Sequence, residues 1–135
     1  PYNDILDGRE HRPEASEIIP WFWRSYSGPG VSVCHNRWIA IHHKGRIAYA
    51  QWKDVGPFVI DDWPYVFEGK RPRATANQNA GIDISPAVRD FLGIRGNAEV
   101  DGRFVEESEV PGGPWAKWIP PQVGQAIRSR SRQLP

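Results

Sequence analysis

The chain has 135 residues, of which 17 are Lys or Arg and 16 are Asp or Glu, giving a net charge of +1. This length fits one domain, and the near-neutral charge does not favour electrostatic binding of the whole domain to nucleic acid. No run of about 20 apolar residues predicts a membrane-spanning helix. The single Cys34 cannot form an internal disulfide, and no Cys/His spacing predicts a metal site, so we expect neither metal nor cofactor.

The composition predicts short strands joined by many turns. Gly and Pro each number 13, which is too many for a helical bundle. The chain also has seven Trp residues, and we expect some of them to line a surface or groove.

The N-terminal third predicts a turn-rich start, one helix and a hairpin. Ser16 is an expected N-cap for a helix running to Trp23, with Pro20 near the fourth helical position. We therefore expect an aromatic helical insertion over residues 16–26. The apolar segments 38–42 and 47–52 predict two antiparallel strands, buried on both faces or closed in a barrel. Between them, Gly45 suits a tight turn with positive φ.

Beyond the hairpin, breaks and short elements alternate. Gly56 and Pro57 end the second strand, and residues 58–60 are expected to resume an extended path. Residues 61–80 read as a long irregular segment, which in a compact domain is usually functional or mobile. Residues 81–84 predict a short strand.

The last elements are a capped helix and a final strand. Ser85 is the expected N-cap, Pro86 the first helical residue and Gly93 the residue that ends the helix. Residues 98–106 predict the last strand region, with a bulge at Gly102. We expect residues 1–118 to form one domain and the polar residues 119–135 to be a poorly ordered tail.

The order of these motifs resembles that of the rare lipoprotein A family. The matching segments are RWIAIHHKGRIAYAQ (37–51), KDVGPF (53–58) and IDISPAVRDFLGI (82–94), within a match over roughly residues 34–106. This resemblance implies a mainly β fold, a six-stranded double-psi β-barrel with one or two short helices. The same barrel is similar to that of the membrane-bound lytic transglycosylase A group, the expansins and the family-45 glycosidases.

The resemblance also implies catalytic residues. Asp54 matches the Asp that acts as acid/base in the lytic transglycosylases, and Asp83 matches a second, supporting Asp. Partial burial of Asp54 at the lip of a groove would favour its protonated form, which can donate a proton to a glycosidic oxygen. A hydrolase would need a second carboxylate, from Asp83, Asp61 or Asp62. The alternative is structural: Asp54 accepts backbone N–H groups in the turn, and Asp83 does so at the helix start.

Candidate substrate-binding residues are aromatic or polar. Tryptophans provide platforms on which sugar rings stack, and a polar loop can contact glycan hydroxyls or carboxylates. The alternatives are core packing for the tryptophans and a solvated loop for the polar residues. In the rare lipoprotein A pattern a Glu and a His precede the hairpin in motifs that this chain lacks, and His35 lies in that region. The candidates are Trp21, Trp23, Trp52, Trp63, Arg73, Asn77, Asn79 and His35.

Two functions from different classes remain open. The first is an enzyme of the lytic transglycosylase or glycosidase type, acting on peptidoglycan or a related polysaccharide, which implies the cell envelope or secretion. The second is a non-catalytic barrel that binds glycan or protein through a Trp-rich groove, and the missing Glu and His motifs favour it. Cys34 beside His35 is not expected to be a nucleophile–base pair, because neighbours in an extended segment point to opposite faces.

Overall fold

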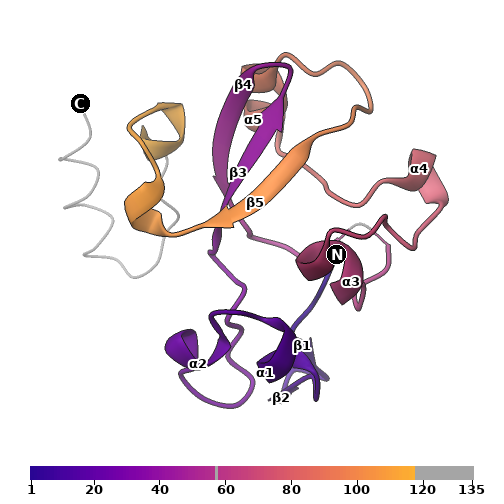
Figure 1. Ribbon diagram of the computed structural model, residues 1–135, viewed down its shortest axis with the longest axis vertical. Coiled ribbons are helices and arrows are strands. Elements are labelled where there is room, and N and C mark those ends of the chain that lie inside the picture. The colour runs from indigo at the N-terminus through magenta and orange to yellow at the C-terminus, as the bar shows by residue number, and fades with distance from the viewer. Residues whose placement is uncertain (57, 118–135) are drawn as a thin grey trace.

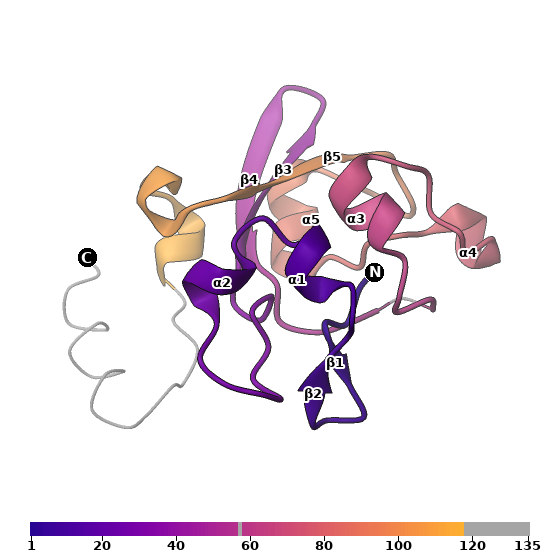
Figure 2. The same cartoon turned by 60° about the horizontal axis from the view of Figure 1, so that its bottom comes forward.

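The computed structural model describes residues 1–56 and 58–117, which form short helices and two antiparallel sheets (Figures 1 and 2). The strands are β1 (Ile5–Leu6), β2 (Glu10–His11), β3 (Trp38–His43), β4 (Arg46–Gln51) and β5 (Asp101–Val105). The α-helices are α1 (Ala15–Ile18), α2 (Phe22–Ser25), α3 (Trp63–Glu68), α4 (Ala76–Asn79) and α5 (Pro86–Leu92). Two 3₁₀-helices follow, η1 (Glu107–Glu109) and η2 (Pro114–Lys117). One sheet pairs β1 with β2, and the other has the order β4-β3-β5.

The expected hairpin is confirmed in β3 and β4. The connection consists of Lys44 and Gly45, whose φ angles of 45° and 81° are those of a type I′ turn. Ala40 and Ile41 are both buried although they point to opposite faces of the sheet, so the middle of β3 is covered on both sides. The chain that leaves β4 leads directly to the Trp52–Asp54 segment.

The final strand β5 pairs with the other edge of β3. Its register runs without an extra residue from Asp101 to Val105, and Gly102 lies opposite Ile41. The prediction of a bulge at Gly102 is therefore wrong. A bulge would place two residues of β5 opposite one of β3, and the pairing leaves no such residue.

Two clusters of buried side chains form the core. The first gathers the N-terminal segment, α1, α2 and the loop before β3, with α3 and β5 packed against it. Its buried members are Tyr2, Ala15, Ile19, Trp21, Phe22, Val33 and Cys34. The second lies between the hairpin and α5, and its buried members are Ile41, Ala48, Leu92 and Ile94. Phe104 of β5 packs on the first cluster and Val100, just before β5, on the second, so one short segment contacts both.

The helix α5 forms as its sequence predicts. The Ser85 hydroxyl accepts a hydrogen bond from the Val88 N–H at 3.3 Å, and Pro86 occupies the first turn. Gly93 ends the helix in the left-handed conformation, at φ 72°. The helix packs against β4 (Figure 1).

The helix expected from Ser16 to Trp23 is instead two helices, and Glu14 rather than Ser16 holds the N-cap position. The break lies at Ile19-Pro20-Trp21. Pro20 has no N–H to donate and its ring clashes with the preceding turn, so a continuous helix is unfavourable here. Ile19 is extended, at φ −92° and ψ 112°, as expected for a residue before proline.

Residues 58–84 also depart from expectation. The segment 61–80 contains α3 and α4; Pro64 in the first turn of α3 and Gly69 in the left-handed conformation at its end are ordinary helix signals. The extended path does not run evenly through residues 58–60, because Phe58 has φ 62°, and only an isolated bridge pairs Asp61 with Tyr2. Residues 81–84 form no strand; Ile82 and Ile84 pack on the second cluster without a pairing partner.

At the level of fold class, the described residues combine antiparallel sheets with short helices, and their strands lie in two sheets rather than one closed barrel. In the described ranges no helix has the length and apolarity needed to span a membrane. The tail expected at residues 119–135 lies outside the described residues.

Candidate active site

A small cavity lies where three separate segments meet. They are the N-terminal residues that lead into β1, the loop before β3, and the loop after β4. Its volume is about 30 Å³, enough for a water molecule. The lining side chains that matter for the argument are Asp4, Ser32, His35, Trp52 and Asp54.

Asp54 lies on the wall of this cavity and is exposed rather than partly buried as expected. Its Oδ1 accepts a hydrogen bond of 2.8 Å from the N–H of Val55, the next residue along the chain. The Asp54 carbonyl oxygen accepts a bond of 2.9 Å from the indole N–H of Trp52. The turn is thus fixed mainly through the backbone of Asp54, which leaves most of its carboxylate open to solvent or a ligand.

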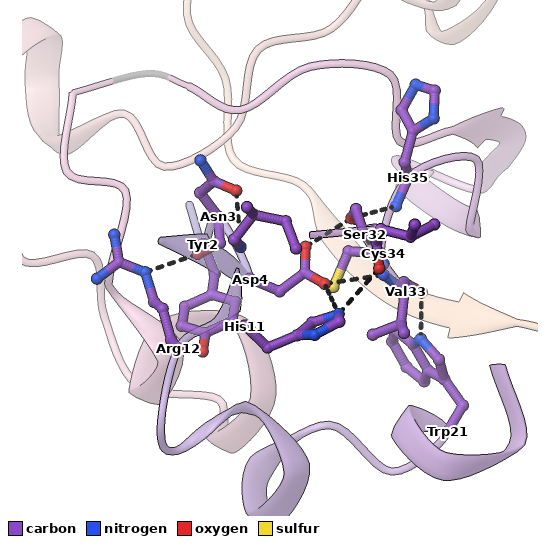
Figure 3. Close-up of polar contacts among 12 residues, drawn as sticks. Tyr2, Asn3, Asp4, His11, Arg12, Trp21, Ser32, Val33, Cys34 and His35 are labelled. Atoms are coloured by element: carbon purple, nitrogen blue, oxygen red, sulfur yellow. Dashed lines mark hydrogen bonds and ion pairs between the residues drawn. The ribbon is translucent and has the colours of Figure 1, made fainter. Parts of the chain in front are cut away.

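Asp4 is the buried acid of the site, and sequence reasoning missed it. Only 1 % of its surface is exposed. Oδ1 accepts a 2.5 Å hydrogen bond from the Ser32 hydroxyl, and Oδ2 accepts one of 2.8 Å from the Val33 N–H. His11 Nε2 lies 3.7 Å from the same Oδ2 (Figure 3). The carboxylate therefore ties the N-terminal segment to the loop before β3.

Ser32 extends this network into the loop. Its hydroxyl oxygen accepts hydrogen bonds of 3.1 Å from the N–H groups of both Cys34 and His35 while it donates to Asp4. Figure 3 shows the His35 ring directed away from the Asp4 carboxylate. Cys34 is buried, and burial raises the pKa of its thiol. An inert buried thiol beside an exposed imidazole agrees with the expectation that the two are not a nucleophile–base pair.

The second expected catalytic residue, Asp83, is not brought to this cavity. It is exposed in the segment between α4 and α5. The start of α5 is capped by Ser85, so the structural role considered for Asp83 at that position belongs to the serine.

The four candidate tryptophans differ in exposure. Trp21 is buried, and its indole N–H donates to the Val33 carbonyl at 2.7 Å. Trp63, at the start of α3, is half-buried against the first cluster. Trp52 is half-buried and stacks on Phe104, with ring centroids 5.7 Å apart. Trp23 lies on α2 and is 71 % exposed, and its ring is close to that of Tyr26, which follows the last residue of α2.

Of the polar candidates, His35 lines the cavity, whereas Arg73, Asn77 and Asn79 lie outside it on the segment that carries α4. Arg73 donates its backbone N–H to the buried Asp62 at 2.8 Å and pairs through its side chain with Asp61 and Asp62. Asn77 accepts two hydrogen bonds from the side chain of Asn97, through its carbonyl and its amide oxygen. Asn77 and Asn79 are exposed in left-handed conformations, at φ 48° and 61°. Figure 1 shows α4 at the edge of the molecule.

The site thus presents the open Asp54 carboxyl and the half-buried Trp52 ring at a water-sized cavity, which the buried Asp4 carboxylate also lines and whose walls it holds together. Such a carboxyl can donate or accept a proton at a bound oxygen. In the part of the chain that the structure describes, no group of three or more His, Cys, Asp or Glu side chains is placed to hold a metal ion. Comparison with protein-family models, with curated proteins and with solved structures finds no match to this chain.

Proposed function

We propose that the chain cleaves a cell-wall glycan or a related polysaccharide by acid/base catalysis, in the manner of a lytic transglycosylase, with Asp54 as the proton carrier. One observation carries the proposal. The Asp54 carboxyl is exposed at the wall of the cavity beside Trp52, and within residues 1–56 and 58–117 its one hydrogen bond comes from the neighbouring Val55. Because the carboxyl is exposed and bonded only to the adjacent backbone, a bound substrate can reach it.

The reaction needs one such group. Protonated Asp54 gives its proton to the glycosidic oxygen as the bond from that oxygen to the anomeric carbon breaks. A hydroxyl of the same sugar attacks the anomeric carbon and returns its proton to the Asp54 carboxylate, so the acid is regenerated. A glycan laid across Asp54 would exclude water from the reacting bond.

The double-psi barrel implied by the motif order is part of this proposal. The hairpin β3–β4, the Lys53–Val55 segment that follows it, the capped helix α5 and the strand β5 occur in the implied order. The antiparallel order β4-β3-β5 supports that reading. The proposed place of action is the cell envelope or the cell exterior.

A second candidate is a non-catalytic glycan-binding module, and two observations favour it. The cavity beside Asp54 has a volume of about 30 Å³, which is too small to enclose a sugar ring. Trp23 and Tyr26 are both exposed and neighbouring, so they offer an aromatic surface to a polysaccharide.

The test is digestion of purified peptidoglycan, with the released fragments identified by mass spectrometry. Wild-type protein is expected to release anhydro-sugar fragments, and Asp54→Asn is expected to release none while remaining folded. Asp83→Asn is the matched control, since Asp83 is exposed and lies outside the cavity. Release that persists in Asp54→Asn would refute the assignment of Asp54. Sedimentation of the wild-type protein with peptidoglycan, without any release, would support the binding module instead.

A further inference from the structure

A second and larger hollow lies at one end of the three-stranded sheet. Its volume is about 360 Å³, large enough for a sugar unit. Three aromatic rings line it: Trp21, Phe67 and Phe104. The centroid of Phe104 lies 4.8 Å from that of Trp21 and 5.6 Å from that of Phe67, so the rings form a continuous apolar wall. We call this hollow the aromatic groove.

Charged side chains stand beside these rings. Glu106 Oε1 accepts a hydrogen bond of 2.7 Å from Arg24 Nη2 and one of 2.8 Å from Arg37 Nη2. All three residues line the groove, and together they carry a net charge of +1. The hydrogen bond from Arg37 lowers the pKa of Glu106, so the carboxylate stays ionised and both guanidinium groups stay anchored.

Arg37 also has an unused donor. Its guanidinium lies 4.1 Å from the centroid of the Trp21 ring, and 15 % of its side chain is exposed. Its Nε–H is buried and finds no acceptor among the described residues. A buried donor without an acceptor costs free energy, and a ligand oxygen would remove that cost.

We propose that the aromatic groove binds the carboxylate-bearing sugar of an acidic glycan. The sugar carboxylate is taken by the guanidinium groups of Arg37 and Arg24, and the apolar face of the ring lies on Phe67 and Phe104. A planar guanidinium suits a carboxylate, and the net positive charge disfavours a cationic ligand. That the ligand is a sugar rests on the proposed function; that it is an anion with an apolar face rests on the groove itself.

The groove is placed to serve the candidate active site. Phe104, which lines the groove, stacks on Trp52, which lines the Asp54 cavity, at an interplanar angle of 20°. One stacked pair of rings therefore lies between the two hollows, with one ring lining each. An acidic sugar held in the groove would fix which bond of a longer chain lies near Asp54, and the groove would act as a specificity subsite.

The test compares two sugars that differ at C6, where methyl β-D-glucuronide has a carboxylate and methyl β-D-glucoside a neutral hydroxymethyl group. Titration of the full chain is followed by NMR through the Arg37 Nε–H and Trp21 indole N–H signals. Wild-type protein is expected to bind the glucuronide at least about tenfold more tightly, because charge-assisted hydrogen bonds from the guanidinium groups form only with the carboxylate. Arg37→Gln is expected to lose this preference, and Arg24→Gln, at a more exposed position, to reduce it.

Arg95→Gln is the matched control, because it removes an exposed arginine that does not line the groove. Equal affinity of the wild-type protein for the two sugars would overturn the inference. An undiminished preference for the glucuronide in both Arg24→Gln and Arg37→Gln, with both variants folded, would also overturn it. The outcome is independent of catalysis: Asp54→Asn is expected to keep the glucuronide preference, so a chain that binds the glucuronide and cleaves nothing would refute the proposed function alone.

Discussion

At the scale of single residues, Asp4 shows how one carboxylate can organise a site. Its two oxygens accept hydrogen bonds from Ser32 and Val33, both far along the chain from Asp4 itself. The Ser32 hydroxyl in turn accepts hydrogen bonds from the N–H groups of Cys34 and His35. The cavity wall beside Asp54 is thus held in shape by an acid that need not touch a substrate.

Asp4→Asn should therefore destabilise the fold. An amide has one acceptor oxygen where the carboxylate has two, so its NH₂ group would face one of the buried donors from Ser32 or Val33. We expect the free energy of unfolding to fall by about 1–3 kcal/mol, measured by urea denaturation. Asp7→Asn is the control, since Asp7 is exposed and its φ of 53° suits Asn. Equal stability of the two variants would show that the Asp4 network contributes nothing.

Glu106 should make part of the free energy of unfolding depend on pH. Its hydrogen bond with Arg37 lowers its pKa in the folded protein below the ordinary value of 4.5. A lowered folded-state pKa means that the stabilisation is complete above 4.5 and is lost as the pH falls through the folded-state pKa. The difference in unfolding free energy between wild type and Glu106→Gln should therefore be largest near pH 7 and vanish in strong acid. Urea titrations across the acid range measure it. A difference that is constant with pH, or one equally large in the exposed control Glu107→Gln, would contradict this account.

At the scale of elements, the helices and strands whose turn and capping residues lie within their own sequence were predictable. The hairpin follows from a glycine at the turn between two apolar runs, and α5 from Ser85, Pro86 and Gly93 in their proper positions. These signals act within a few residues, so no knowledge of the rest of the fold is needed. The prediction of one continuous helix from Ser16 to Trp23 was wrong. Proline is tolerated in the first turn of a helix, but Pro20 lies beyond the first turn of α1, where it ends the helix.

Elements that depend on distant partners were not predictable in the same way. Residues 81–84 have a strand-like pattern, but whether a strand forms depends on a neighbour to pair with, and Ile82 and Ile84 instead pack on the second cluster. The strand β5 was expected, yet its continuous register at Gly102 is set by β3 rather than by its own sequence. A lone glycine in a strand favours a bulge only when the partner strand allows one.

At the scale of the whole molecule, the site combines a local motif with a distant contact. Asp54 was a candidate because its segment KDVGPF, which follows the hairpin, resembles a motif of the rare lipoprotein A family. Asp4 was not, because Ser32 lies 28 residues away and nothing in the first fifteen residues marks an acid as buried. The aromatic groove was missed for the same reason, since Arg24, Arg37 and Glu106 meet only in the folded chain.

The two core clusters raise the question of whether the molecule unfolds as one unit. The segment around β5 places Val100 on the second cluster and Phe104 on the first, and β3 lies between its two partner strands. Loss of packing in either cluster should thus weaken both. Leu92→Ala, which removes a side chain only 3 % exposed, should lower the free energy of unfolding by about 2–5 kcal/mol. In a urea series, the NMR signals of Ala48 and of the Trp21 indole should then disappear at the same, lowered midpoint.

Ile47→Ala is the control, because Ile47 is 45 % exposed and its loss creates little cavity. It should move the common midpoint only slightly. Separate midpoints in Leu92→Ala, with the Ala48 signal lost early and the Trp21 signal unchanged, would show that the clusters unfold independently. The expected single domain would then be two units, and the Asp54 cavity and aromatic groove would remain with the first cluster, since Trp52 and Phe104 both pack there.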